Sequence, residues 1–401
     1  MSNIYEKIGV KTIINASGPS TRLSGSIMPP EVSDAMREAS RHCVDIAELQ
    51  ARASEVIAEV TCAEAGYVTS GAAAGLMLGT AACVTGLDPG KMNRLPDTAG
   101  MNDEVIISRS QRNFYDHAIR SVGITLIEVG LADRFSGAGV RDTEAWEIED
   151  AITEKTAAIC YVANPHALPP LQEVVRVAHD HSVPVIVDAA GQLPPASNLR
   201  RFISEGADLV AFSGGKAIRG PQSSGILAGR RDLIMSVALQ HLDQDIYFEQ
   251  WTPPVTLIDK DRLPGAPQHG IGRPCKVGKE EIVGLLTALK LFAEEPEEAR
   301  YQRWQTFTDA LVEAMSDIPG TTVDSLSDPR KTDVPMARLM LDEESLGLSA
   351  LDLVIRLQNG SPGIHANPSR SGEGIVLFGP ACLKEGEPEI IGNVVRSLLS
   401  E

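Results

Sequence analysis

The chain has 401 residues, of which 43% are hydrophobic, so it can form a large core and a second, smaller domain. Its formal net charge of −18 opposes binding to nucleic acid or to an anionic membrane. No stretch is apolar and long enough to span a bilayer, and the start, MSNIYEKIGVKTIIN, lacks the order of a signal peptide, so we expect a cytoplasmic protein. The six cysteines show no paired spacing, which predicts neither a disulfide framework nor a metal site.

Hydrophobic periodicity predicts strands that alternate with helices along most of the chain. The expected strands are residues 12–15, 67–68, 105–108, 125–129, 157–162, 183–187, 209–212 and 225–229. The expected helices are two within 30–60, one from residue 72, and those at 113–122, 143–153 and 171–181. This βαβ series indicates a mostly parallel sheet that helices cover on both faces.

The remainder of the chain predicts a second, smaller domain. Helices are expected at 279–293 and 299–315, strands near 334–341 and 374–378, and a final helix after Pro388. We therefore expect an α/β fold made of a large domain and a small C-terminal α/β domain. The expected divisions are an N-terminal arm and first helix at 1–45, the large domain at 46–278 and the small domain at 279–401.

Two residues at strand ends carry the main functional hypothesis. Lys216 follows the apolar run Leu209, Val210, Ala211 and Phe212, where a buried strand ends in a Ser-Gly-Gly turn. A lysine desolvated there can act as an amine in Schiff-base chemistry, although Lys216 alone also fits a surface lysine in a glycine-rich loop.

Asp188 ends another apolar strand, and ligands of open parallel sheets bind beyond the carboxyl ends of the strands. An acid and a lysine presented together suit pyridoxal 5'-phosphate (PLP): the lysine holds the aldehyde and the acid keeps the pyridine nitrogen protonated.

A phosphate seat is expected where a small-residue turn opens an apolar helix. Ser70, Gly71 and Ala72 occupy that turn in AGYVTSGAAAGLMLG, and the first turn of a helix offers free N–H groups and the positive end of the dipole. The turn is not a Walker loop, because the required lysine and hydroxyl are missing. An ordinary capped, buried helix is the alternative interpretation.

Four segments, VTSGAAAGL, VIISRSQRN, VPVIVDAAGQLPP and ADLVAFSGGKAIRGPQSSGILAGRRDLI, together resemble the PLP enzymes of the aspartate-aminotransferase fold, fold type I. The branch they resemble includes bacterial selenocysteine synthase and D-glucosaminate-6-phosphate ammonia-lyase. The resemblance implies that Lys216 is the Schiff-base lysine and Asp188 the partner of the pyridine nitrogen. It assigns further cofactor contacts to Ser70, Gly71, Ala72, Ser213, Gln192, Gln111 and Arg112, of which Gln111 or Arg112 covers the ring.

Candidate substrate residues lie in two further segments. HGIGRPCKVGKEE resembles this branch, so Arg273 and Lys276 are candidate ligands of a phosphate or a substrate carboxylate, supplied within the chain or by a neighbouring subunit; a solvated basic loop is the alternative. Relatives carry a late PPIxxR arginine, whereas this chain has SPGIHANPSR, which leaves Arg370 and the adaptable donor His365 as candidates. Members of this fold generally build the site at a dimer interface, so we expect a homo-oligomer.

The expected enzyme is a PLP-dependent lyase for an amino acid or amino sugar acid. It would remove the Cα proton and eliminate a β-substituent, releasing ammonia and a 2-keto acid. A racemase or epimerase, an aldolase and an aminotransferase would use the same lysine and acid. Two further alternatives carry less weight. A selenocysteine synthase-like transferase is opposed by the acidic net charge, which disfavours tRNA. A non-catalytic PLP-fold protein is opposed by the presence of both Lys216 and Asp188.

Overall fold

The computed structural model describes residues 3–131, 142–327 and 333–400. The chain packs into two compact units. The large unit is formed by residues 28–293, and the small unit by residues 1–27 and 294–401.

The large unit alternates strands and helices. Its strands are β2 (Ala65–Thr69), β3 (Glu104–Ser108), β4 (Thr125–Val129), β5 (Thr156–Val162), β6 (Val185–Asp188), β7 (Leu209–Ser213) and β8 (Gly225–Gly229). Its α-helices are α2 (Pro30–Ala39), α3 (Ile46–Thr61), α4 (Ala72–Thr85), α5 (Pro89–Arg94), α6 (His117–Arg120), α7 (Ala145–Asp150), α8 (Leu171–Asp180), α9 (Asn198–Ser204), α10 (Arg231–His241) and α11 (Lys279–Glu294). Short 3-10 turns are η2 (Arg109–Gln111), η3 (Phe114–Asp116), η4 (Lys260–Arg262) and η5 (Arg273–Cys275).

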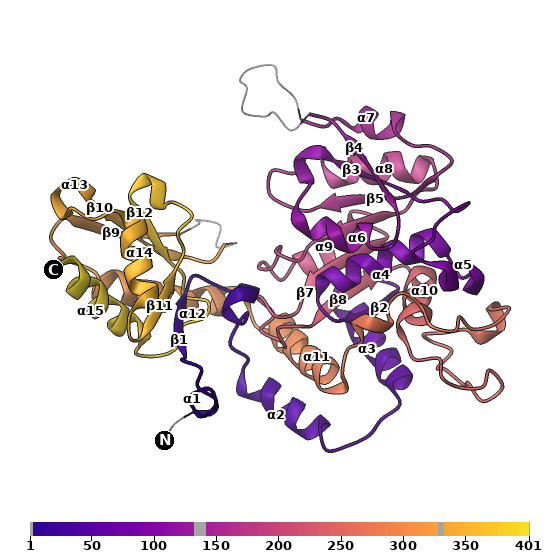
Figure 1. Cartoon of the computed structure of the whole chain (residues 1–401), viewed down its shortest axis with the longest axis horizontal. Coiled ribbons are helices and arrows are strands. Elements are labelled where there is room, and N and C mark those ends of the chain that lie inside the picture. The colour runs from indigo at the N-terminus through magenta and orange to yellow at the C-terminus, as the bar shows by residue number, and fades with distance from the viewer. Residues whose placement is uncertain (1–2, 132–141, 328–332, 401) are drawn as a thin grey trace. The chain divides into compact units, whose positions relative to one another are not determined.

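The strands of the large unit form one seven-stranded sheet in the order β2-β8-β7-β6-β5-β3-β4 (Figure 1). The neighbours from β4 through β3, β5 and β6 to β7 pair in parallel, whereas β8 pairs antiparallel with both β7 and β2. Strand β2 therefore runs in the same direction as β7. As a result, every strand except β8 ends at the same edge of the sheet.

Helices cover both faces of this sheet, and each face has its own apolar core. One core gathers side chains of α4, α5, α6 and α10. The other gathers side chains of α7, α8, α9 and α11. Because both faces are buried, the central strands are continuous apolar runs rather than alternating ones.

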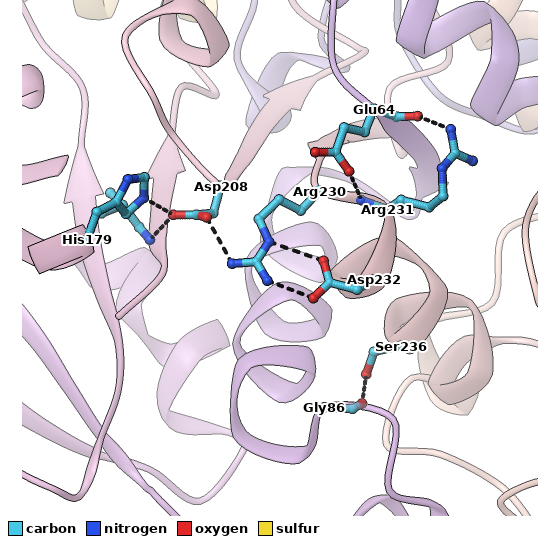
Figure 2. Close-up of polar contacts among 9 residues, drawn as sticks. Glu64, Gly86, His179, Asp208, Arg230, Arg231, Asp232 and Ser236 are labelled. Atoms are coloured by element: carbon cyan, nitrogen blue, oxygen red, sulfur yellow. Dashed lines mark hydrogen bonds and ion pairs between the residues drawn. The ribbon is translucent and has the colours of Figure 1, made fainter. Parts of the chain in front are cut away.

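The opposite, amino edge of the sheet is held by the buried carboxylate of Asp208 (Figure 2). Its Oδ2 accepts the Val185 N–H at 2.8 Å and lies 2.9 Å from Nε2 of His179. Its Oδ1 accepts from the Arg230 guanidinium at 3.1 Å, and Arg230 also pairs with Asp232. The cluster ties the start of β6 to the residues before β7 and after β8, which sets the register of the strands that end at Asp188 and Ser213.

We expect Asp208→Ala to lower the free energy of unfolding by about 2–3 kcal/mol, because it leaves a buried N–H and a partly buried guanidinium without their acceptor. Urea denaturation followed by circular dichroism measures this loss. Asp232→Ala is the matched control: the Asp232 side chain is 42% exposed, so the loss of stability should stay below about 1 kcal/mol. Equal losses in the two variants would show that Asp208 does not hold the edge.

The small unit contains a three-stranded antiparallel sheet and a two-stranded parallel one. The first has the order β12-β10-β9, from β9 (Thr321–Leu326), β10 (Met336–Leu341) and β12 (Ile375–Phe378). The second pairs β1 (Ile13–Ala16) with β11 (Gly363–Ala366). The remaining elements are α1 (Ile4–Lys7), η1 (Thr21–Leu23), α12 (Glu297–Ala314), α13 (Glu343–Leu346), α14 (Ala350–Asn359), η6 (Ser371–Glu373) and α15 (Glu387–Leu399).

The predicted fold class is confirmed, with local differences. The helix expected at 113–122 is instead the short turn η3 followed by the one-turn helix α6, because Asn113 caps Tyr115 and Gly123 ends the segment with φ +97°. Strand β9 was not expected, since its half-exposed sequence TTVDSL gives a weak apolar pattern.

The predicted domain boundaries at 45/46 and 278/279 stay predictions, and the packing units change at other residues. Residues 1–27 group with the small unit because β1 pairs with β11. Helix α11 groups with the large unit because Ile282, Leu285 and Leu289 are buried in its core. Among the described residues, no helix is long and apolar enough to cross a membrane.

Candidate active site

The carboxyl edge of the large sheet brings most of the predicted site residues together. Strand β2 ends one residue before Ser70, β3 ends shortly before Gln111, and β7 ends at Ser213. Strand β6 ends at Asp188, whose Cα pairs in register with Ala211 of β7. The pattern of strand ends in the sequence thus predicts a single crevice, as is general for open parallel sheets.

Lys216 and Asp188 interact at this edge of the sheet. Asp188 is 9% exposed, and its Oδ1 accepts the Ala190 N–H at 3.0 Å. Burial raises the pKa of Asp188, while the Ala190 N–H and the nearby positive charge of Lys216 act in the opposite direction. A Cβ placed on Gly191 would lie 3.9 Å from the Lys216 Nζ, so the turn after Asp188 also faces the amine.

The turn that carries Lys216 is fixed by its backbone. The Gly214 N–H donates to the Ser224 carbonyl, and the Gly220 N–H donates to the Gly214 carbonyl, both at 2.9 Å. A Cβ on Gly214 would stand 2.3 Å from the Ser224 Oγ, and one on Gly215 would stand 2.5 Å from the Gln222 Cα. Glycines are therefore required here, and they hold Lys216 on a rigid support.

The turn before α4 forms a cradle suited to a phosphate. Gly71 has φ +85°, and a Cβ on it would meet no atom within 4 Å, so this side of the turn is open. Gly225 of β8 lets the turn approach, because a Cβ on Gly225 would stand 2.6 Å from the Ala72 nitrogen. Gly225 pairs with Thr69 and Ser213, so the first turn of α4 lies beside the end of β7. Its N–H groups have no partners within the helix and favour an anion.

The two residues expected to cover the ring are held by other groups. Gln111 is buried; its Oε1 accepts the Val162 N–H at 2.8 Å and its Nε2 donates to the Leu168 carbonyl at 3.3 Å. Arg112 donates to Asp116 at 2.5 Å and also pairs with Glu128. Gln111 therefore hydrogen-bonds the end of β5 and the loop after it, and Arg112 forms ion pairs with Asp116 and Glu128.

A residue that the sequence reasoning missed lies beside them. The Ser110 Oγ is buried and has no hydrogen-bond partner among the described residues. A buried hydroxyl normally has a partner, so Ser110, two residues after β3, is a candidate cofactor contact. The signal was present in the sequence as a polar residue two positions after a buried strand.

Three further candidates are placed as follows. Gln192 lies in the turn after Asp188, where its N–H donates to the Ala189 carbonyl at 3.0 Å. Arg273 donates to the His241 carbonyl at 3.0 Å and to Asp243 at 2.8 Å, so its guanidinium is committed to these acceptors. Lys276 is exposed and follows Cys275, whose carbonyl accepts from the Ser70 hydroxyl at 2.8 Å. Lys276 is therefore the chain neighbour of Cys275, which contacts the turn before α4 directly.

The other two substrate candidates belong to the small unit. Arg370 pairs with Glu373 on the same turn, which reduces its suitability as a carboxylate ligand. His365 lies in β11, and burial together with the positive charge of Arg22 lowers its pKa. A neutral His365 can donate or accept a hydrogen bond. Arg22 was not singled out from the sequence.

These residues fit PLP. Lys216 can hold the aldehyde, Asp188 can face the pyridine nitrogen, and the open cradle at Gly71 matches a phosphate. The Ser110 hydroxyl, which has no hydrogen-bond partner among the described residues, could supply a further polar contact.

A family model described as "SelA: L-seryl-tRNA selenium transferase" matches residues 13–250. The chain belongs to this family. The matched region contains every predicted cofactor residue from Ser70 to Lys216.

Individual relatives extend the likeness to the whole chain. A D-glucosaminate-6-phosphate ammonia lyase of Salmonella typhimurium is 32% identical, covering 99% of this chain and 98% of the relative. A 5'-C-glycyluridine monooxygenase-decarboxylase of a Streptomyces species is 31% identical over 98% of this chain and 92% of the relative. An L-seryl-tRNA(Sec) selenium transferase of Nitratidesulfovibrio vulgaris is 27% identical but covers 60% of this chain and 53% of the relative.

Solved structures agree with this assignment. A structure of D-glucosaminate-6-phosphate ammonia-lyase matches with a TM-score of 0.81 and 30% identity, covering 100% of this chain and 99% of the other. A C-DES mutant with glycine covalently linked to its PLP cofactor matches with a TM-score of 0.55 and 17% identity, covering 99% of this chain and 98% of the other, and shows the fold alone. The protein is a PLP-dependent enzyme of fold type I, and the predictions of cofactor and lyase class are confirmed.

Proposed function

We propose that the protein is an ammonia lyase for a 2-amino-3-hydroxy acid of the amino sugar acid class, phosphorylated at its far end. The observation that carries this proposal is the Lys216–Asp188 pair beside the phosphate cradle, in a chain alike over its full length to an enzyme named for such a substrate. The individual site residues are proposals as well.

Each proposed residue has a distinct task. Bound PLP supplies an aldehyde that captures the substrate amine and a ring that accepts electrons from Cα. The N–H groups of the first α4 turn bind the cofactor phosphate, and Asp188 holds a proton on the pyridine nitrogen. Lys216 Nζ takes the proton from the substrate Cα. The rigid glycine turn keeps this amine at the same place during turnover.

The overall reaction balances without an oxidant. Removal of the Cα proton and the C3 hydroxyl releases one water, and hydrolysis of the resulting enamine consumes one water. The products are ammonia and a 2-keto-3-deoxy acid. Lys276 is the proposed ligand of the substrate phosphate, because it is exposed and next to the cradle, whereas Arg273 is committed to His241 and Asp243.

One observation favours a second candidate function. The monooxygenase-decarboxylase relative is nearly as similar as the lyase, at 31% against 32% identity. In that function the enzyme would consume O2 and release CO2 from a glycyl-substituted nucleoside. A selenium transferase is disfavoured because net charge −18 opposes tRNA.

A substrate panel tests the proposed function. The purified PLP-loaded protein is given 2-amino-2-deoxy sugar acids, with and without a 6-phosphate, and a glycyl nucleoside. Ammonia, 2-keto acid, O2 and CO2 are measured. We expect ammonia and keto acid in equal amounts from a phosphorylated sugar acid, with kcat/KM reduced at least about tenfold when the phosphate is absent, since a charged hydrogen bond is lost. O2 uptake with CO2 release from the nucleoside would support the second candidate instead.

We further propose that the enzyme is a homo-oligomer, at least a dimer, with its site near a subunit interface. Its support is the exposure of large apolar side chains in the large unit: Phe114 is 92% exposed, Tyr247 78% and Val255 71%. A cytoplasmic location is also part of the proposal, and the six free cysteines support it.

A further inference from the structure

Residues 270–276, here called the strap, pack against the carboxyl end of α10. The Gly272 N–H donates to the Gln240 carbonyl at 3.0 Å. A Cβ on Gly270 would stand 2.2 Å from the Gln240 Cα, so this approach requires glycine. Arg273 then donates to the His241 carbonyl at 3.0 Å and pairs with Asp243. The strap therefore satisfies carbonyls that the end of a helix leaves without partners.

The His241 side chain links the strap to strand β2. It is 2% exposed, its Nδ1 lies 2.9 Å from the Tyr67 hydroxyl, and its Nε2 lies 3.0 Å from the Cys275 carbonyl. A carbonyl can only accept, so Nε2 carries the proton. Burial lowers the pKa of His241, which favours the neutral ring, and Nδ1 then accepts from the Tyr67 hydroxyl. The Cys275 carbonyl thus fixes the tautomer, and the Tyr67 hydroxyl orients the ring.

The Cys275 carbonyl has a second donor, the Ser70 hydroxyl at 2.8 Å. The Cys275 oxygen therefore accepts from both His241 and Ser70, and so connects the strap to the turn that opens α4. Because the Ser70 proton is directed at this carbonyl, the Ser70 side chain acts as a tether, and the N–H groups of the turn are left for the cofactor phosphate. Lys276 follows Cys275 directly in the chain and is exposed.

We propose that His241, oriented by Tyr67, is a positioning residue for the phosphate end of the cofactor site: it sets the Cys275 carbonyl that anchors Ser70. The inference rests on the proposed function, because it assumes that the turn at Gly71 receives the PLP phosphate. It assigns His241 no contact with the cofactor or with reacting atoms.

The test compares two probes on the apoprotein: PLP, and pyridoxal, which lacks the phosphate. Dissociation constants are measured by absorbance titration for wild type, His241→Leu, His241→Gln and Tyr67→Phe. We expect His241→Leu to weaken PLP binding about tenfold and to leave pyridoxal binding unchanged, since a buried hydrogen bond is lost at the phosphate end only. His241→Gln, which can still donate to Cys275, should recover most of the PLP affinity, and Tyr67→Phe should weaken PLP binding by a smaller factor.

Tyr161→Phe is the matched control, because it removes a buried tyrosine hydroxyl from β5, away from the strap. It should change neither dissociation constant. Unchanged PLP binding in folded His241→Leu, or equal weakening of PLP and pyridoxal, would overturn the inference. If His241→Leu does not fold, the ratio of the PLP to the pyridoxal dissociation constant in Tyr67→Phe and His241→Gln decides instead. If wild-type protein binds PLP no better than pyridoxal, the turn at Gly71 does not bind the cofactor phosphate, and the proposed function is wrong as well.

Discussion

Replacing Lys216 with alanine should lower kcat/KM for ammonia release by about 10⁴-fold or more, because both the covalent attachment of the cofactor and the base that removes the Cα proton are lost. The Lys216-dependent visible absorption of the PLP-loaded protein should disappear as well. The fold should survive, since Lys216 sits on a turn held by backbone hydrogen bonds of Gly214 and Gly220.

Lys290→Ala provides the matched control for this prediction. Lys290 is an exposed lysine on α11, far along the chain from the glycine turn. Its removal should leave both absorption and rate within about twofold of wild type. If Lys216→Ala keeps the absorption band and the rate, another amine holds the cofactor and the active-site assignment is wrong.

Asp188→Asn is expected to lower the rate of catalysis and to leave the fold intact. The rate should fall at least about 100-fold, because a preorganised negative charge at the pyridine nitrogen is removed. PLP should still bind through Lys216 and the cradle at Gly71. Asp150→Asn, at an exposed position on α7, is the control and should behave as wild type. A rate within about tenfold of wild type in Asp188→Asn would show that Asp188 does not act on the ring.

In the apoprotein, the contribution of Asp188 to the free energy of unfolding should depend on pH in the opposite sense from that of an ion-paired carboxylate. Burial raises the pKa of Asp188 above its unfolded value, so its favourable contribution to stability is present below the unfolded pKa and is lost as pH rises through the folded pKa. The stability of apo Asp188→Asn relative to wild type should therefore rise as pH rises from the unfolded to the folded pKa of Asp188, and stay constant above both values. Chemical denaturation at several pH values, without cofactor, measures it. A wild type that gains stability over Asp188→Asn with rising pH would contradict the desolvation argument.

The large unit was predictable because its signals are local. Apolar runs such as Val183–Val187 and Leu209–Phe212 indicate buried strands, and their order with intervening helices implied a parallel sheet. Polar residues at strand ends then had to meet at one edge, which is where Asp188 and Lys216 lie.

The features that the sequence did not predict depend on contacts between distant residues. Tyr67 meets His241 across 174 positions, and Ser70 meets Cys275 across 205, so no local pattern indicates either contact. Gly225 resembles an ordinary strand residue in the sequence, and only the packing of the turn at Gly71 shows why it is glycine. The strand β1 was expected at 12–15, but its pairing with β11, which lies near the other end of the chain, was not.

The most direct test of the account is to identify the lysine that carries the cofactor. Borohydride reduction of the PLP-loaded protein fixes the cofactor covalently, and peptide mass mapping locates it. We expect a label on the peptide that contains Lys216, and its loss when excess phosphorylated amino sugar acid is added before reduction. A label on another lysine, or no label in wild type, would contradict the assignment of the site at the carboxyl edge of the sheet.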